Sequence, residues 1–111
     1  MIELTKSQKK KVRALIELGL MRDYVAGIKG AKAVCDSFIE GKSEPKEYYL
    51  KLYSTIADKD RDIGRRYNDL RGSQYFIRLL MLLREGVLLN EEIHELDEEL
   101  KERIFFILRE N

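Results

Sequence analysis

The sequence predicts an all-α protein, a small bundle of three to five helices. Apolar residues recur at three- and four-residue steps along most of the chain, which is the helical period. Pro45 is the single proline among 111 residues, so almost nothing forbids long helices. No segment alternates apolar and polar residues as a half-buried strand does. Because 111 residues accommodate one core, we expect one all-helical domain spanning residues 1–111.

The first helix is expected to begin after Thr5, which forms a capping-box pattern with Gln8. Apolar residues then recur at helical spacing from Val12 to Ile39. Gly19 leaves two alternatives open: one helix over about 6–40, or two shorter helices that meet in a turn at 19–21. Past this segment, Gly41 should end the helix, with Ser43 as the next N-cap and Pro45 in the first turn of the second helix.

The second helix carries a heptad seam that a partner helix could occupy. Its members are candidate self-association residues: Tyr49, Tyr53, Ile56, Ile63, Tyr67 and Leu70. Asp60 occupies an apolar position of the seam, where a polar residue can fix register or oligomeric state at a cost in stability. The alternative is that the seam faces the protein's own core.

A central apolar helix is expected near residues 74–85, because Tyr75–Leu83 is apolar on nearly all sides. A small monomer has difficulty covering such a helix, which favours self-association. Gly72-Ser73 is either a turn or a tolerated interruption before it. Gly86 should end it, and Asn90 should cap a last amphipathic helix over about 91–110.

Charge is distributed unevenly although 21 Lys and Arg nearly balance 20 Asp and Glu. Residues 1–35 contain eight bases and three acids, and residues 86–111 contain three bases and eight acids. This polarity favours packing of the first helix against the last, or head-to-tail contacts between copies. The alternative is that solvated helix faces simply differ in charge.

Localisation is expected to be cytoplasmic. The lone cysteine, Cys35, forms no intramolecular disulfide, which fits a reducing compartment. The first residues lack the pattern of a signal peptide. The most apolar run, Tyr75–Leu83, is too short to span a bilayer, so no membrane contact is expected. We expect Cys35 itself to be buried in an apolar stripe as a small hydrophobe.

Residues for catalysis are scarce, and the sequence predicts a non-enzymatic protein without metal or cofactor. His94 is the only histidine, and we expect it to be a surface residue rather than a metal ligand with Glu91 or Glu98. The acidic stretch 58–62 lacks the glycine and glutamate of a calcium loop. No phosphate-binding or dinucleotide-binding glycine pattern is present.

A DNA-binding reading depends on Gly19. The stretch 18–25 is similar to the middle of many helix-turn-helix motifs, which would occupy about residues 11–30. Asp23 and Ala26 would then lie at the major groove, and the candidate nucleic-acid contacts are Lys9, Lys10, Lys11, Arg13, Arg22 and Lys29. A second candidate is the run of arginines and tyrosines from Arg61 to Arg78, if one helix continued through Gly72. In the competing reading, residues 26–33 form a small-residue face against another helix.

The leading hypothesis is a helical protein-interaction module, an adaptor or regulator that binds a protein partner and self-associates into a homo-oligomer. The alternative is a small DNA-binding regulator that uses the turn at Gly19.

Overall fold

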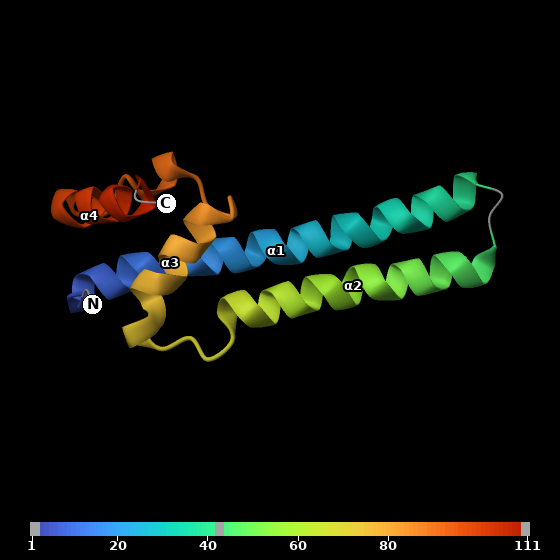
Figure 1. Ribbon diagram of the computed structural model, residues 1–111, viewed down its shortest axis with the longest axis horizontal. Coiled ribbons are helices and arrows are strands. Elements are labelled where there is room, and N and C mark those ends of the chain that lie inside the picture. Colours follow the sequence, from blue (N-terminus) through green and yellow to red (C-terminus); the bar gives the residue numbers. More distant parts are fainter. Residues whose placement is uncertain (1–2, 42–43, 110–111) are drawn as a thin grey trace.

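The computed structural model describes residues 3–41 and 44–109, and these form an all-α structure as the sequence predicts. Four α-helices follow one another: α1 (Lys6–Glu40), α2 (Pro45–Tyr67), α3 (Tyr75–Arg84) and α4 (Glu98–Arg109). Two short 3₁₀ helices, η1 (Gly72–Gln74) and η2 (Asn90–Ile93), precede α3 and α4. Figure 1 shows α1 as a long spine, with α2 antiparallel along its second half and α3 crossing its first half.

Helix α1 is continuous through Gly19, so the predicted alternative of two helices with a turn is wrong, and with it the helix-turn-helix motif at 11–30. The capping box is confirmed: the Gln8 N–H donates to Thr5 Oγ1 at 3.1 Å, and the Thr5 N–H donates to Gln8 Oε1 at 2.8 Å. Gly19 is buried, and a Cβ there would lie 3.0 Å from the Tyr67 hydroxyl and 3.2 Å from Leu82 Cδ1. Glycine is therefore needed at this position for close packing rather than for a turn.

Helix α2 begins at Pro45, with Glu44 at the N-cap position that we had expected Ser43 to occupy; Ser43 itself lies outside the described residues. The helix ends at Tyr67, and Asp69, two residues further on, has a positive φ of 55°. The Arg78 guanidinium closes this end by donating to the carbonyl oxygens of Arg65, Arg66 and Asn68. Side chains can satisfy free C-terminal carbonyls in this way.

Helix α3 is the predicted central apolar helix, and five of its side chains are buried. Gly86 follows its end with a φ of +77°, and the Val87 N–H donates to the Leu82 carbonyl at 3.0 Å, which closes the helix. Helices α1 and α4 and the loop between α3 and α4 cover most of α3. Our expectation that one chain has difficulty covering this helix is therefore wrong for all but one of its large apolar side chains, since only Ile77 among them is exposed.

The last helix is shorter than expected. Residues 90–93 form η2, and α4 begins only at Glu98, so Asn90 does not cap it. The Leu89 N–H is instead satisfied by Glu92 Oε1 at 2.8 Å. This turn brings Ile93 and Leu96 into the core before α4 adds Leu100 and Ile104.

The core lies at one end of an elongated molecule. The extents are 56 × 25 × 23 Å and the radius of gyration is 17.7 Å. A compact chain of this length has a radius of gyration of about 13 Å. The clustered core residues come from 4–16 and 76–104, whereas Val34 is the one buried hydrophobic residue of the described part of α1 beyond Ile16. The α1–α2 hairpin therefore projects from the core as a two-helix arm (Figure 1).

Gly30→Ala should raise the free energy of unfolding by about 0.5–1 kcal/mol, because alanine favours a helix interior over glycine. An added Cβ would meet only the Thr55 methyl, at 3.4 Å, which is ordinary contact. Urea unfolding followed by circular dichroism measures this. Gly19→Leu is the contrasting variant, and it should destabilise because the space there is filled. A loss of stability in Gly30→Ala would contradict the packing described.

Candidate protein-interaction surface

One face of the hairpin is apolar along its length and is not covered by the described part of the chain. Residues 24, 28, 31, 35 and 38 follow one another at helical steps on α1, and residues 49, 53, 56 and 63 do so on α2. We call this surface the apolar hairpin face, and it comprises Tyr24, Ile28, Ala31, Cys35, Phe38, Ile39, Tyr49, Tyr53, Ile56 and Ile63, together with the acidic Asp60.

Exposure on the apolar hairpin face is high for such large side chains: Ile28 is 70%, Ile39 76%, Tyr49 71% and Tyr53 69% exposed. Two shallow grooves lie between the helices on this side. Near the tip, Cys35 and Phe38 face Tyr49 across a groove of about 400 Å³; near the base, Ile28 and Ile56 line one of about 270 Å³. Monomeric proteins rarely leave contiguous apolar patches of more than a few hundred Å² exposed.

The opposite side of the hairpin is polar. Its groove is lined by Ala26, Thr55, Asp58 and Asp62, together with Gly27 and Lys59 between the helices. Ion pairs at helical spacing cover this side and the outer edge, for example between Arg61 and Asp58 at 3.1 Å. The hairpin thus has one solvated face and one face with the composition of a buried surface.

The six candidate self-association residues divide between these environments. Tyr49, Tyr53 and Ile56 are exposed on the apolar hairpin face, and Ile63 lines its inner groove. Tyr67 and Leu70 instead pack against the protein's own core, and Leu70 lies beyond the end of α2. The reading in which the seam faces the protein's own core therefore holds for Tyr67 and Leu70, which are not available to a partner, whereas the described chain leaves Tyr49, Tyr53 and Ile56 exposed.

A buried ionic cluster joins the hairpin to the core. Asp23 is 3% exposed, and its Oδ1 accepts from Lys59 Nζ at 2.7 Å and from Arg66 Nη1 at 2.6 Å. The Tyr67 hydroxyl donates to Oδ2 at 2.6 Å. Arg66 also donates to Glu85 Oε1 at 2.9 Å, at the end of α3. The cluster therefore fixes α1, α2 and α3 relative to one another at the base of the hairpin.

The cluster shifts the protonation of its members. Burial would raise the pKa of Asp23, but hydrogen bonds from Lys59 and Tyr67 and the charge of Arg66 lower it below its usual value. Burial and the hydrogen bond to Asp23 raise the pKa of Tyr67. The hydrogen bond from Arg65 is the main reason that the pKa of Glu85 falls to about 2. These groups are therefore held as fixed charges or as a neutral phenol at neutral pH, which suits a structural role.

The candidate nucleic-acid contacts do not form one free basic surface. Arg22 donates to both carboxylate oxygens of Glu92 and to the Val87 carbonyl. Lys11 donates to the Glu95 carbonyl at 3.1 Å, and Arg13 pairs with Glu17 at 3.3 Å. Lys9 is half-buried beside Gly72, whereas Lys10 and Lys29 are exposed. The basic first half of α1 thus contacts acidic residues near η2 and α4, as its charge contrast with the C-terminal part suggests.

The arginine–tyrosine run from Arg61 to Arg78 does not form one continuous face, because no helix continues through Gly72. Arg65 pairs with Glu85 at 2.8 Å, and Arg78 closes the end of α2. Asp23, which the helix-turn-helix reading placed at a DNA groove, is buried instead. The sequence signal that we missed is that Asp23 lies four residues from both Gly19 and Gly27, which places all three residues on one side of α1.

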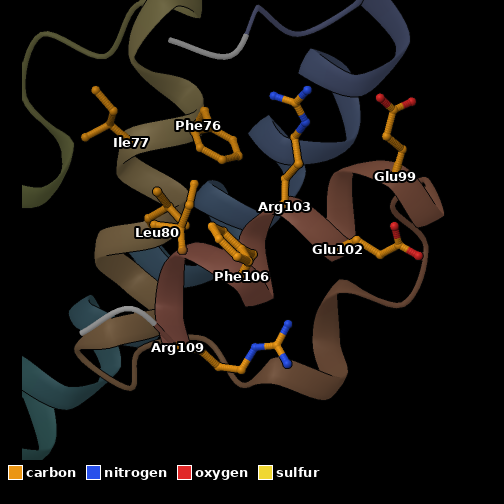
Figure 2. A pocket seen from close by; sticks show the side chains of 9 residues that line it. Phe76, Ile77, Leu80, Glu99, Glu102, Arg103, Phe106 and Arg109 are labelled. Atoms are coloured by element: carbon orange, nitrogen blue, oxygen red, sulfur yellow. The ribbon is translucent and has the colours of Figure 1, made fainter.

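A further groove, of about 920 Å³, lies between α3 and α4. Figure 2 shows Phe76, Leu80 and Phe106 in its apolar floor, with charged side chains around them: Glu99, Glu102, Arg103 and Arg109. Phe106 is 59% exposed. The mixed charge of this rim gives no preference for an anionic or a cationic ligand.

Other candidate chemistry is sparse among the described residues. His94 is exposed, as expected, with Nδ1 3.1 Å from the Glu91 carbonyl. Residues 3–41 and 44–109 contain no group of three metal-ligating side chains. Cys35 is exposed on the apolar hairpin face, so our expectation that it is buried is wrong. None of the described helices has the length and apolar composition needed to cross a membrane.

Comparison with protein-family models, with curated proteins and with solved structures found no match to this chain. The functional conclusion therefore depends on the chain's own residues.

Proposed function

We propose that this chain is a non-enzymatic helical protein-interaction module, an adaptor or regulator that self-associates and binds partners through the apolar hairpin face. The observation that carries the proposal is the contrast between the two sides of the hairpin. One side exposes tyrosine, isoleucine and phenylalanine, and the other is lined by Asp58, Asp62 and Thr55. A helix pair with one apolar face is stable when that face is covered.

The amount of exposed surface supports the same proposal. The chain has an accessible surface of 7999 Å². A compact monomer of 13.1 kDa exposes about 6400 Å². The excess of roughly 1600 Å² exceeds the area of about 800 Å² that each partner buries in an interface of standard size. Covering the hairpin with helices of a partner therefore removes a surface large enough for stable association.

The surface chemistry favours a protein partner over nucleic acid. The apolar hairpin face carries three tyrosines and one acidic group, Asp60, and aromatic residues are enriched at the centres of protein interfaces. Binding to nucleic acid needs basic side chains directed at phosphates, whereas Lys11, Arg13 and Arg22 contact groups of this chain.

Self-association should disappear when the apolar hairpin face is made acidic. In Ile28→Glu/Tyr53→Glu, each carboxylate would be buried without a partner in the associated form, and the affinity should fall at least about a hundredfold. Sedimentation equilibrium of the wild-type 13.1-kDa chain and of the variant across protein concentrations measures this.

The matched control is Ala26→Glu/Ser54→Glu, which adds the same two carboxylates to exposed positions on the other side of the same helices. Its affinity should remain within a few-fold of the wild type. Equal loss in both variants would point to net charge rather than to the apolar hairpin face. A wild type that stays monomeric at high concentration would contradict self-association.

A further inference from the structure

The apolar hairpin face is nearly symmetric about its own midpoint. On α2, Tyr49 and Ile63 lie seven residues before and after Ile56. On α1, Tyr24 and Phe38 lie seven residues before and after Ala31. A Cβ on Gly30 would contact the Thr55 methyl, so the two midpoints lie at the same level of the hairpin. Turning this face end over end about its midpoint therefore places large apolar side chains on large apolar side chains.

We propose, building on the proposed function, that the occupant of the apolar hairpin face is a second copy of this chain in antiparallel orientation. The two hairpins then form a four-helix bundle. Ile56 lies at the two-fold axis of this bundle, α2 packs on α2 of the other copy, and the tip of each hairpin reaches the base of the other. Closed two-fold dimers are the commonest oligomers, and self-complementary patches generate them.

Like-charge repulsion disfavours the parallel orientation. Around the tip, residues 40–47 contain three glutamates, Glu40, Glu44 and Glu47, and two lysines, Lys42 and Lys46. With Ile56 at the two-fold axis, each tip comes level with the base of the other hairpin, so an antiparallel dimer holds the two tips apart. A parallel dimer places the two acidic tips together, where like charges repel.

Asp60 provides a polar contact that is specific to the antiparallel register. Its carboxylate is exposed on the apolar hairpin face and forms no hydrogen bond or ion pair with the described residues. Tyr53 lies seven residues earlier on α2 and is 69% exposed. With Ile56 at the two-fold axis, the Tyr53 hydroxyl of one copy comes beside Asp60 of the other and can donate to it. A polar pair in an apolar seam fixes register in this way.

The distance between the two hairpin tips tests the orientation. A spin label at Glu44→Cys, in a Cys35→Ser background, lies twelve residues from Ile56. Because a helix rises 1.5 Å per residue, the labels in an antiparallel dimer should be about 35–40 Å apart. In a parallel dimer both tips are at one end, and the labels should be about 15–20 Å apart. Double electron–electron resonance measures the distance, and sedimentation confirms that the labelled chain has the wild-type dimer affinity.

A tip-to-tip distance near 20 Å, in a dimer that Ile28→Glu/Tyr53→Glu abolishes, would overturn the antiparallel arrangement and leave the proposed function standing. A dimer that survives Ile28→Glu/Tyr53→Glu would overturn both.

A double-mutant cycle of Tyr53→Phe and Asp60→Asn gives an independent check of the register. The fold-loss of dimer affinity in the double variant should be about tenfold smaller than the product of the fold-losses in the two single variants. Independent effects would contradict the contact between Tyr53 and Asp60.

Discussion

Asp23→Ala should destabilise the fold by about 3 kcal/mol or more, because removal of one partner leaves buried charge uncompensated. Arg66 is 9% exposed and would retain only Glu85, while Lys59 and the Tyr67 hydroxyl would lose the carboxylate that they contact. The loss should appear as a lower urea midpoint and as a melting temperature lower by roughly 10 °C or more for a domain of this size. Unfolding is to be followed by circular dichroism at one fixed protein concentration, since self-association also contributes to stability.

Two further variants separate charge from contact. Asp23→Asn keeps an oxygen acceptor for Tyr67 but removes the negative charge, and it should cost less than alanine. Asp36→Ala breaks an exposed pair with Lys32 on the same helix, and it should change the free energy of unfolding by less than about 1 kcal/mol. A cost for Asp23→Ala as small as that of Asp36→Ala would show that the buried cluster does not hold the three helices together.

Acidification should unfold the protein through the same cluster and through the Arg22–Glu92 pair. Hydrogen bonds from Arg65 hold the pKa of Glu85 at about 2, and hydrogen bonds from Arg22 and from the Leu89 N–H hold the pKa of Glu92 at about 2. Each value is below the ordinary 4.5 of a glutamate in the unfolded chain. The unfolded state therefore binds protons first, and the stability that these groups contribute is present above about pH 5 and is lost toward pH 2.

The lowered pKa of Asp23 acts in the same direction and affects the most buried of the three carboxylates. The free energy of unfolding should therefore fall by about 3 kcal/mol or more in total between pH 6 and pH 2. Urea midpoints at unit pH steps measure the fall. Glu85→Gln/Glu92→Gln should start lower at pH 6 and show a weaker dependence on pH. Equal slopes in the variant and the wild type would assign the acid sensitivity to other groups.

The amount of the fold that could be predicted from sequence differed between its elements. The capping box of Thr5 and Gln8, the apolar helix near 74–85 and the end of that helix at Gly86 were confirmed, because each depends on interactions within a few residues. The start of the last helix was wrong. Ile93 and Leu96 match the spacing of an amphipathic helix, but they reach the core from η2 and the turn after it.

Gly19 shows more clearly why the local sequence could not predict every element of the fold. A glycine flanked by apolar residues fits both a turn and a close helix contact, and nothing local separates the two. The side chains that decide between them, Tyr67 and Leu82, lie 48 and 63 residues further along the chain. The same holds for Asp23, whose partners are on α2. The seam from Tyr49 to Leu70 was predicted as a single surface, but packing against the core removed Tyr67 and Leu70 from it.

The sequence by itself determined that this protein is helical and that its apolar residues form stripes, because helix period, capping and breaking are properties of neighbouring residues. It also placed Tyr49, Tyr53 and Ile56 on one such stripe. Only the tertiary structure decided which stripes the chain covers for itself. Helix α3, the most apolar segment, is covered by α1, α4 and the loop between α3 and α4, whereas the hairpin extends beyond the core and leaves its apolar face exposed. The reason is physical: burial depends on which helices the fold brings together, and periodicity contains no information about distant partners.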